Sequence, residues 1–162
     1  MKQKFNQSGF TLLELLVVIA IIGLLASVVT LALQSARAKA RDTKRAADVR
    51  QLVTSMEQYR ITHGQYPTGT GSMASVGSGV ALDDPTAMDG GPEPFVPNYI
   101  PLIPTSPKPA DGDCGATTGI GGNDYWYESS DDGTAYTITY CIGKDVGSLG
   151  PGVHSATPGG IQ

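Results

Sequence analysis

The chain has 162 residues and a formal net charge of −4, which suits one modest domain with an additional N-terminal helix. Its charges are divided unevenly, because residues 1–62 hold nine Lys or Arg and four Asp or Glu, whereas residues 63–162 hold two and eleven. This division argues against a basic nucleic-acid-binding domain and favours packing of unlike charges between copies of the chain.

The first predicted element is an apolar segment that carries a single acid near its start. No charge occurs from Leu15 to Ala36. At about 1.5 Å per residue this segment forms a helix of about 33 Å, which is enough to cross a hydrocarbon core of about 30 Å. It is therefore predicted to span a membrane or to be buried on all sides.

Glu14 is the acid in this segment. A carboxylate there costs on the order of 2.5 to 3.5 kcal/mol in a membrane, and no Lys, Arg or His lies between Lys4 and Arg37. We therefore predict that Glu14 is unpaired or protonated in a single helix. Cleavage between Gly9 and Phe10 would create an α-amine about one helical turn from Glu14. Glu14 could then be neutralised by the amine of its own chain or by that of a neighbour. Glu14 is thus predicted to be an assembly contact between subunits.

This N-terminus resembles that of a type IV prepilin or a type II secretion pseudopilin. The likeness rests on a short leader, residues 1–9, and on a set of residues around its end: Lys2, Lys4, Gly9, Phe10, Thr11, Leu12 and Glu14. The resemblance implies that a prepilin peptidase cleaves after Gly9 and methylates Phe10. It also implies that Glu14 meets the Phe10 amine of an adjacent subunit, and that a pilus or type II secretion assembly platform builds a helical homopolymer.

The resemblance implies an α+β, pilin-like fold in which one long N-terminal helix packs against a small antiparallel sheet with long Gly- and Pro-rich loops. One departure concerns a proline that many members have past the middle of the apolar segment. Leu31 stands about there in this chain, so only Gly23 remains to weaken the helix. The missing proline therefore weakens the expectation that this helix melts locally in the filament.

Two other interpretations of the apolar segment remain. A secretory signal peptide could be cleaved at Ala36-Arg37-Ala38, although this segment is long for one and contains an acid. A single-pass anchor for an extracytoplasmic binding module explains the length of the segment but not Glu14. The chain begins at Met1 in that alternative, whereas a filament subunit begins at Phe10.

The helix is predicted to continue to about Thr62. Residues 37–50 hold six basic and two acidic residues and are typical of a solvated face or of a surface that binds acidic domains of neighbouring subunits; binding to nucleic acid phosphates is less favoured. An apolar stripe follows at Val49, Leu52, Val53, Met56 and Tyr59, and it is predicted to face a globular domain. Gly64 and Pro67 are expected to end the helix.

Two features of the sequence predict opposite orientations of the chain in the membrane. Two basic residues precede the apolar segment and six follow it, so the positive-inside rule alone would place the C-terminal domain in the cytoplasm. The leader and the cysteine pair indicate the opposite. We expect storage in the cytoplasmic membrane, followed by an extracellular filament or a periplasm-spanning pseudopilus.

The C-terminal region begins with two segments of irregular composition. Residues 65–94 are rich in Gly, Ser and Thr and are predicted to be a loop. Residues 92–109 contain frequent prolines, which exclude helix and central strand, so an extended segment held by Phe95, Tyr99, Ile100 and Ile103 is expected. A third strand from residues 98–103 is a weaker possibility.

A hairpin is predicted from residues 124–129 and 135–142, joined by a short turn. Tyr136, Ile138 and Tyr140 alternate with residues that include Cys141, so one face should pack on the helix. Cys114 and Cys141 are expected to form a disulfide outside the cytoplasm, where closing a loop of about 28 residues contributes roughly 3 to 4 kcal/mol; two unrelated buried thiols are the alternative. Residues 143–162 are predicted to be irregular.

Candidate catalytic or metal-binding residues are few. His63 and His154 lack metal-ligand spacing and a neighbouring nucleophile, so surface or capping roles are expected. The acidic pairs fit no EF-hand spacing and are predicted to be solvated turns: Asp83-Asp84, Asp111-x-Asp113 and Asp131-Asp132. Major pseudopilins often hold calcium after the last strands, where this chain offers one acid, Asp145, beside a lysine. We expect no enzyme activity, no metal and no cofactor, with calcium as the alternative.

The sequence thus predicts a leader at 1–9, a membrane or filament-core helix at 10–36, an amphipathic continuation at 37–62 and a loop-rich head at 63–162. Within the filament class, a pilus, a secretion pseudopilus and a DNA-uptake filament are equally compatible with one chain.

Overall fold

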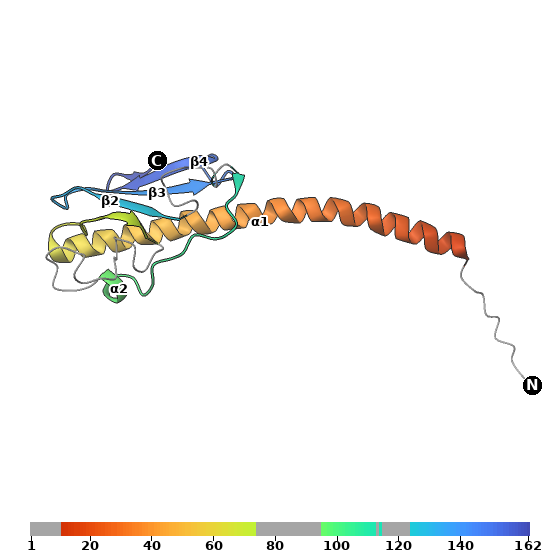
Figure 1. The fold of residues 1–162 in the computed structure, drawn as a ribbon, viewed down its shortest axis with the longest axis horizontal. Coiled ribbons are helices and arrows are strands. Elements are labelled where there is room, and N and C mark those ends of the chain that lie inside the picture. The colour runs from red at the N-terminus through yellow and green to blue at the C-terminus, as the bar shows by residue number, and fades with distance from the viewer. Residues whose placement is uncertain (1–10, 74–94, 113, 115–123) are drawn as a thin grey trace, which may run out of the picture. The chain divides into compact units, whose positions relative to one another are not determined.

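The computed structural model describes residues 11–73, 95–112, 114 and 124–162. The chain divides into two units, Met1–Arg37 and Ala38–Gln162. We call the first the N-terminal segment and the second the head. The elements in chain order are α1 (Leu12–His63), β1 (Thr70–Ser72), α2 (Phe95–Asn98), β2 (Trp126–Ser129), β3 (Tyr136–Ile142), β4 (Gly152–Thr157) and β5 (Gly160–Ile161) (Figure 1).

Helix α1 supplies the N-terminal segment and the helical part of the head. It runs without interruption through Gly23 and Leu31, which confirms the prediction of one long helix. At its C-terminal end, Gly64 adopts a left-handed conformation with φ of 79°, and its amide donates to the carbonyl of Arg60 at 2.7 Å. Only glycine takes this conformation at little cost, so Gly64 ends the helix as predicted.

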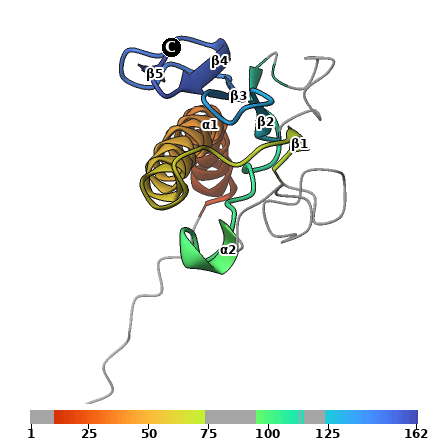
Figure 2. The same ribbon diagram turned by 90° about the vertical axis from the view of Figure 1, so that its left-hand side faces the viewer.

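The head contains a five-stranded antiparallel sheet with the strand order β1-β2-β3-β4-β5. The predicted hairpin is confirmed as β2 and β3, with Trp126 opposite Thr139 and Ser129 opposite Tyr136. Along β3 every second side chain is buried, so this strand presents one apolar face, as its alternating sequence indicates. The sheet lies on one side of the head's part of α1, and α2 lies on the other (Figure 2).

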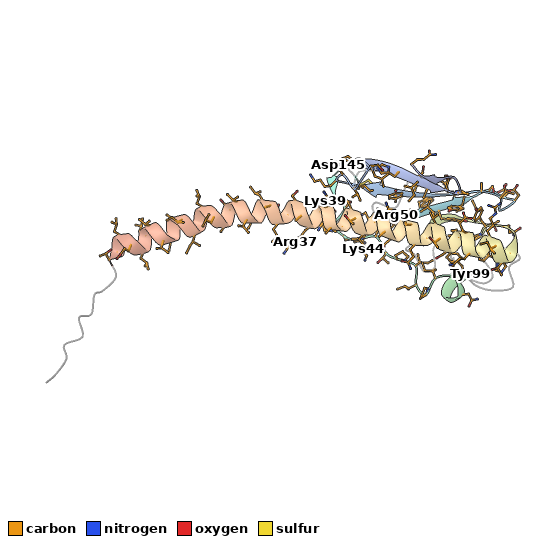
Figure 3. The ribbon with its side chains drawn as sticks, turned by 180° about the vertical axis from the view of Figure 1, so that it is seen from behind. Arg37, Lys39, Lys44, Arg50, Tyr99 and Asp145 are labelled. Atoms are coloured by element: carbon orange, nitrogen blue, oxygen red, sulfur yellow. A yellow bond between two sulfur atoms is a disulfide. The ribbon has the colours of Figure 1, made fainter. Side chains whose placement is uncertain are left out.

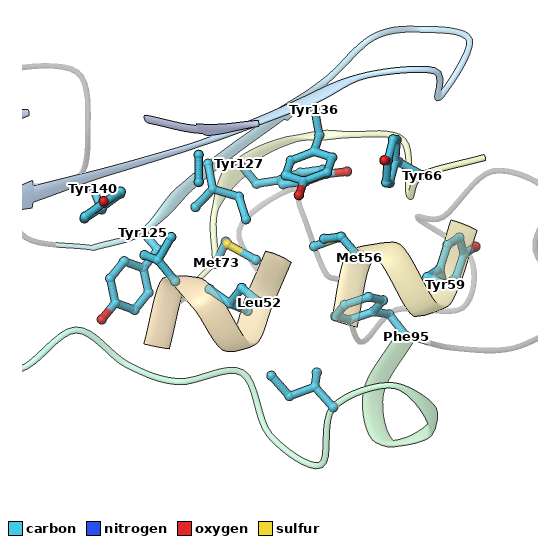
Figure 4. Packing of buried hydrophobic residues seen from close by; sticks show 14 of the residues in the cluster. Leu52, Met56, Tyr59, Tyr66, Met73, Phe95, Tyr125, Tyr127, Tyr136 and Tyr140 are labelled. Carbon is cyan, nitrogen blue, oxygen red and sulfur yellow. The ribbon is translucent and has the colours of Figure 1, made fainter. Parts of the chain in front are cut away.

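The core of the head lies between α1 and these two layers (Figure 4). The stripe predicted on α1 is confirmed, because Val49, Leu52, Met56 and Tyr59 are buried and Val53 packs against the same core. Each large apolar side chain removed from water stabilises the head by about 1.5 to 3 kcal/mol. Burial of this stripe therefore attaches the sheet to the helix.

Tyrosine hydroxyls add polar contacts across this core. Tyr125 donates to Asp48 on α1 at 2.9 Å, and Tyr66 donates to Glu57 at 2.8 Å. The hydroxyls of Tyr136 and Tyr140 are also buried but have no hydrogen-bond partner within the described part of the chain. The tyrosines of the core are therefore not equivalent, since only some of them exchange a bond with water for a bond within the protein.

Three predictions about irregular regions are wrong. The tail contains β4 and β5, because β4 pairs with five residues of β3 and this pairing outweighs its weak local preference for strand. A short strand, β1, lies at Thr70–Ser72 in the predicted loop, of which residues 74–94 fall outside the described residues. Residues 98–103 form no strand, since the further strands come from β1, β4 and β5.

The proline-rich segment holds one turn of helix, α2, which was not predicted. Its proline, Pro97, occupies the first turn of the helix, where an amide hydrogen would have no partner within the helix anyway. The expectation that this segment is held against the helix is confirmed, because Phe95 and Ile100 are buried and Tyr99 and Ile103 pack against the core.

Candidate assembly site

The first turn of α1 contains a reciprocal hydrogen-bonded pair formed by Thr11 and Glu14. The amide and the hydroxyl of Thr11 donate to Oε2 of Glu14 at 3.0 and 2.9 Å, and the amide of Glu14 donates to Oγ1 of Thr11 at 3.2 Å. This arrangement is a capping box, in which two side chains satisfy amides that the helix leaves free. It also places a carboxylate at the positive end of the helix dipole.

The prediction concerned a cationic partner for Glu14, and the described residues of the single chain supply none; they supply Thr11, which hydrogen-bonds the carboxylate instead. Thr11 is the residue that the sequence analysis missed, because only charged residues were considered as partners. The spacing Thr-x-x-Glu before an apolar run is itself the sequence signal of a capping box, so this contact was available from the sequence.

The remainder of the N-terminal segment is apolar and uncovered. Its large aliphatic side chains, from Leu12 to Leu33, are between 45% and 82% exposed. Among the described residues, α1 is the one helix long and apolar enough to cross a membrane. None of its apolar 18-residue stretch is buried. This part of the helix is therefore not covered by the described residues of its own chain, so its apolar surface needs an apolar environment from outside the chain.

In the head, four charged residues form what we call the arginine clasp: Arg41, Asp42 and Arg45 of α1, and Asp111. Arg41 donates through Nε to Oδ2 of Asp111 at 2.7 Å and through Nη2 to Oδ1. Arg45 pairs with Asp42 and also reaches Oδ2 of Asp111 at 3.1 Å. The two arginines and the two aspartates balance in charge. This balance allows Arg45 to be only 1% exposed.

Oxygen atoms from the extended segment complete the surroundings of Arg45. Its Nη2 donates to the carbonyls of Pro107 and Pro109 at 2.7 and 3.1 Å, and its Nε donates to Oγ of Ser106 at 3.3 Å. A buried guanidinium needs such acceptors for all of its donors. Arg45 therefore fastens residues 106–111 to the helix.

Asp42 connects the same cluster to the end of β3. Its carboxylate accepts from the amides of Gly143 and Lys144 at 3.2 and 2.8 Å. The prediction that residues 37–50 form a solvated face is wrong for Arg45 and in part for Arg41, which binds within the chain. The exposed residues Lys39, Lys44 and Arg50 fit that prediction.

The clasp has a defined electrostatic consequence. The hydrogen bonds from Arg41 and, to a smaller extent, the one from Arg45 hold the pKa of Asp111 below its usual value, although burial opposes this effect. The same bond raises the pKa of Arg41. Both groups are therefore charged over the physiological pH range, and the clasp is an ion-pair cluster rather than a site for proton transfer.

A disulfide lies beside the clasp. Cys114 and Cys141 are joined, with their Cα atoms 5.5 Å apart, which is the bridge that the sequence analysis expected. Next to it the backbones of residues 111 and 143 lie so close that a Cβ placed on Gly143 would be 2.3 Å from the carbonyl carbon and oxygen of Asp111. The bridge, the clasp and this close backbone approach together connect residues 106–112 and 114 to both α1 and the sheet.

Comparison with known proteins agrees with these features. The Prokaryotic N-terminal methylation motif matches residues 4–30. The type II secretion system core protein G of Aeromonas hydrophila is 38% identical over 107 residues, which cover 65% of this chain and 70% of that protein. The core protein G of Vibrio cholerae is 30% identical over 154 residues, which cover 94% and 92%. The chain belongs to the pilin and major pseudopilin family.

A pilus protein is also among the relatives of this pilin-family chain. The type IV wide pilus major component PilA4 of Thermus thermophilus is 42% identical over 72 residues, which cover 44% of this chain and 55% of that protein. No solved structure is a significant match.

The predicted site residues of this pilin or pseudopilin lie in different places. Gly9 and Phe10 fall outside the described residues, as do Asp83-Asp84 and Asp113. His63 stacks on Tyr59 with ring centroids 4.1 Å apart and contacts its carbonyl at the helix end. His154 lies in β4, with its ring nitrogens near backbone carbonyls.

The described residues contain no group of three or more His, Cys, Asp or Glu side chains that could hold a metal ion. Asp111 and Asp42 are engaged by arginines and amides. Asp132 is bound by hydroxyls in its own turn, where hydrogen bonds from Ser130 and Thr134 hold its pKa at about 2.

Proposed function

We propose that this chain is a structural subunit, and not an enzyme, of a helical filament, and that it is stored in the cytoplasmic membrane before assembly. The observation that carries this proposal is the uncovered apolar surface of α1, which holds one acid at its start. An anchor needs such a surface, and in an anchor Glu14 would serve only the capping box with Thr11. A filament could also use the charge of Glu14 between subunits.

Assembly transfers the apolar surface from lipid to the helices of other copies. Repetition of one heterologous contact that does not close on itself builds a helical fibre. The energetic gain in such a fibre comes from packing and from polar pairing, since lipid is already as apolar as the side chains of the helix. The polar pair at the N-terminus would therefore determine the register between neighbouring helices.

We propose that cleavage after Gly9 and methylation of Phe10 by a prepilin peptidase create the partner of Glu14. The amine of Phe10 in one subunit would then replace, or share, the Thr11 contacts of Glu14 in the next. The capping box supports this step because it holds the carboxylate at the helix end before any neighbour arrives. Outside the membrane, exposed basic residues of the head would meet acidic surfaces of other heads.

Between the two kinds of filament, we propose a secretion pseudopilus. The likeness to the Vibrio cholerae core protein G covers 94% of this chain, whereas the likeness to PilA4 covers 44%. The head is thus included in the first likeness to a greater extent than in the second. Deletion of the chromosomal copy should block export of folded proteins and leave twitching motility intact; the reverse result would identify a surface pilus.

Processing is tested by mass spectrometry of the protein extracted from membranes and from sheared fibres. We expect a mature chain that begins at N-methylated Phe10. A mature chain that begins at Met1 would identify a membrane-anchored binding module, and one that begins beyond Ala38 would identify a secreted protein.

The role of Glu14 is tested by separating its charge from its capping bonds. In E14Q the glutamine can still accept from Thr11 but cannot pair with an amine as a full charge, so we expect membrane insertion without fibres. T11V is the matched control, because it removes the threonine hydroxyl and keeps the acid, and it should still form fibres. Normal fibres from E14Q would refute charge pairing.

We further propose that the head folds without a metal or a cofactor. The arginines supply the positive charge that Asp42 and Asp111 require. Thermal unfolding of the full chain should therefore be the same in calcium and in a chelator, and a chelator-dependent loss of stability would contradict this.

A further inference from the structure

The four lysines of the head gather at one end of it, although they come from three separate parts of the sequence. We call them the lysine collar: Lys39, Lys44, Lys108 and Lys144, all of which are exposed. Lys39 and Lys44 lie on α1. Lys108 stands between two prolines whose carbonyls bind Arg45, and the amide of Lys144 donates to Asp42 at 2.8 Å. The backbones of Lys108 and Lys144 are therefore level with residues 42–45 of α1.

Within the part of the head that the structure describes, few acids remain free to neutralise the collar. Asp42 and Asp111 are occupied by the arginine clasp. Among the described residues, the exposed acid at this end is Asp145, which follows Lys144. Figure 3 shows Lys39, Lys44 and Asp145 near the Ala38 end of the head.

Exposed acids lie instead at the other end of the head. Asp131 and Asp132 occupy the β2–β3 turn, in which the carbonyl of Gly133 accepts from the amide of Tyr66 at 2.8 Å, just beyond the C-terminus of α1. Among the described residues, the lysines thus lie at the Ala38 end of the head, and Asp131 and Asp132 lie at its His63 end, together with one exposed arginine, Arg60. The described charges of the head are therefore polarised. Counting charges by sequence position does not reveal this polarity, because Lys108 and Lys144 belong to the acidic half of the chain.

The position of the collar along α1 matches the surface of a membrane. Lys39 follows three residues after Ala36, where the uncharged apolar segment ends. At about 1.5 Å per residue, Lys39 and Lys44 lie about 5 and 12 Å further along the helix, and a headgroup layer is roughly 5 to 8 Å thick. Helical side chains tilt toward the N-terminus, and a lysine can extend its stem along apolar surface, so both ammonium groups point back toward the headgroups.

We propose that the lysine collar binds the anionic headgroups of the membrane leaflet from which the head emerges, while the subunit is stored before assembly. This inference rests on the proposed function, because it requires a stored, membrane-spanning subunit. Lys39 and Lys44 are about 140° apart around the helix, and Lys108 and Lys144 come from other segments. A protein partner would contact one face, whereas a leaflet surrounds the helix and reaches every member.

The inference also gives a role to the basic residues after the apolar segment. Their number is unexpected from the positive-inside rule if the head lies outside the cytoplasm. Clusters of basic residues beside a membrane span favour anionic lipid, by about fivefold for each residue near the surface. The attraction is screened by salt, so the subunit remains extractable when the assembly machinery acts on it.

The test uses the full chain in nanodiscs that contain phosphatidylglycerol and phosphatidylcholine in equal parts. Native mass spectrometry of the protein ejected from these discs counts the bound lipids of each headgroup type. We expect phosphatidylglycerol to exceed phosphatidylcholine on the unmodified chain. The variants K39Q/K44Q and K108Q/K144Q should each reduce that excess by about tenfold or more. R50Q is the control, because Arg50 is exposed on the same helix about 17 Å beyond Lys39, and it should change nothing.

Several results would overturn the lysine collar. An unchanged excess in both double variants would do so, and so would an equal loss in R50Q, which would indicate a general charge effect. If K39Q/K44Q alone lost the phosphatidylglycerol excess, Lys108 and Lys144 would not belong to the lipid-binding surface, and the collar as defined would be contradicted. Retention of phosphatidylglycerol together with loss of fibres would assign the lysines to acidic surfaces of a second copy. Fluorescence of Trp126 checks that each head is folded.

The proposed function and the lysine collar fail in different ways. If the unmodified chain retains phosphatidylglycerol but is never processed or built into fibres, the proposed function is contradicted and the collar stands. If fibres form normally but no anionic lipid is enriched, the collar is contradicted and the proposed function stands.

Discussion

The N-terminal segment and the head satisfy their polar groups over very different distances along the chain. In the N-terminal segment, Glu14 binds Thr11, three residues away. In the head, Arg45 binds oxygen atoms that are between 61 and 66 residues away in the sequence, and Asp42 binds an amide 101 residues away. The first region can form as an isolated helix, whereas the second requires the whole head to be folded.

This difference bears on the proposed function. A helix that completes its own hydrogen bonds could be transferred from lipid to a fibre, as proposed, without refolding. The head, by contrast, holds its charges in contacts that only its native fold brings together. We therefore expect substitutions in the arginine clasp to affect folding of the head and to leave the N-terminal helix intact.

The largest effect is expected from R45M. Removing the guanidinium leaves Asp42 buried without its cation and leaves Asp111 with Arg41 alone, and breaking such a buried pair costs about 3 to 5 kcal/mol. Trp126 is the one tryptophan of the chain and lies in β2, so urea unfolding followed by its fluorescence reports on the head alone. R50M is the matched control on the exposed side of α1 and should change stability by less than about 0.5 kcal/mol. Equal effects of the two would show that the clasp contributes nothing.

The next effect concerns the disulfide, because it links segments that the clasp also links. In C114S/C141S the unfolded head regains the freedom of a loop of about 28 residues, which costs roughly 3 to 4 kcal/mol in the chain-entropy model. The measurement is the same urea unfolding, with the unmodified chain in reductant as a second test. The helical far-UV circular dichroism of the N-terminal segment should persist after the head has unfolded; its loss in parallel would contradict the independence of the two regions.

A smaller effect should distinguish two tyrosines of one core. In Y125F, Asp48 loses the hydroxyl that donates to it at 2.9 Å, and leaving such an acceptor unsatisfied costs about 1 to 3 kcal/mol. Y140F removes a buried hydroxyl that has no partner in the described part of the head, so it should be neutral or stabilising. If Y140F destabilises the head as much as Y125F does, the hydrogen bond is not the cause.

The smallest effect is a dependence of stability on pH. Because its arginines hold the pKa of Asp111 below the value of an unfolded aspartate, the unfolded state binds the proton more readily. The contribution of Asp111 is therefore complete above its unfolded pKa and is lost as the pH falls through its folded pKa. Urea midpoints at pH 6 and pH 3 should differ more for the unmodified chain than for D111N, and equal differences would contradict this.

The sequence predicted those parts of the fold whose signals are local. The stripe on α1 and the alternation along β3 each occupy a short stretch of chain, so helix and hairpin could be predicted from periodicity. Strand β4 could not, because its one glycine and its polar residues have a weak preference for strand and become ordered by pairing with β3. The short helix α2 was missed because prolines were taken to exclude any helix, although the first turn accepts one.

The same distinction applies to the site residues. Glu14 was found from its isolation in an apolar run, and Thr11 was overlooked although the two are three residues apart. The contacts of Arg45 were beyond sequence reasoning, since nothing in residues 37–50 shows which of six basic residues is buried. The lysine collar was hidden for a related reason: two of its members come from the acidic half of the chain, and only the fold places them beside Lys39 and Lys44.

The close approach at Gly143 has a consequence for the evolution of such chains. Even the smallest side chain at this position would collide with the backbone of Asp111 and would displace the carboxylate that both arginines bind. Relatives that keep this pair of arginines and the facing aspartate should therefore also keep a glycine at the equivalent place. Where that glycine has changed, the whole set should have changed with it, so that four positions in three distant parts of the chain vary together or not at all.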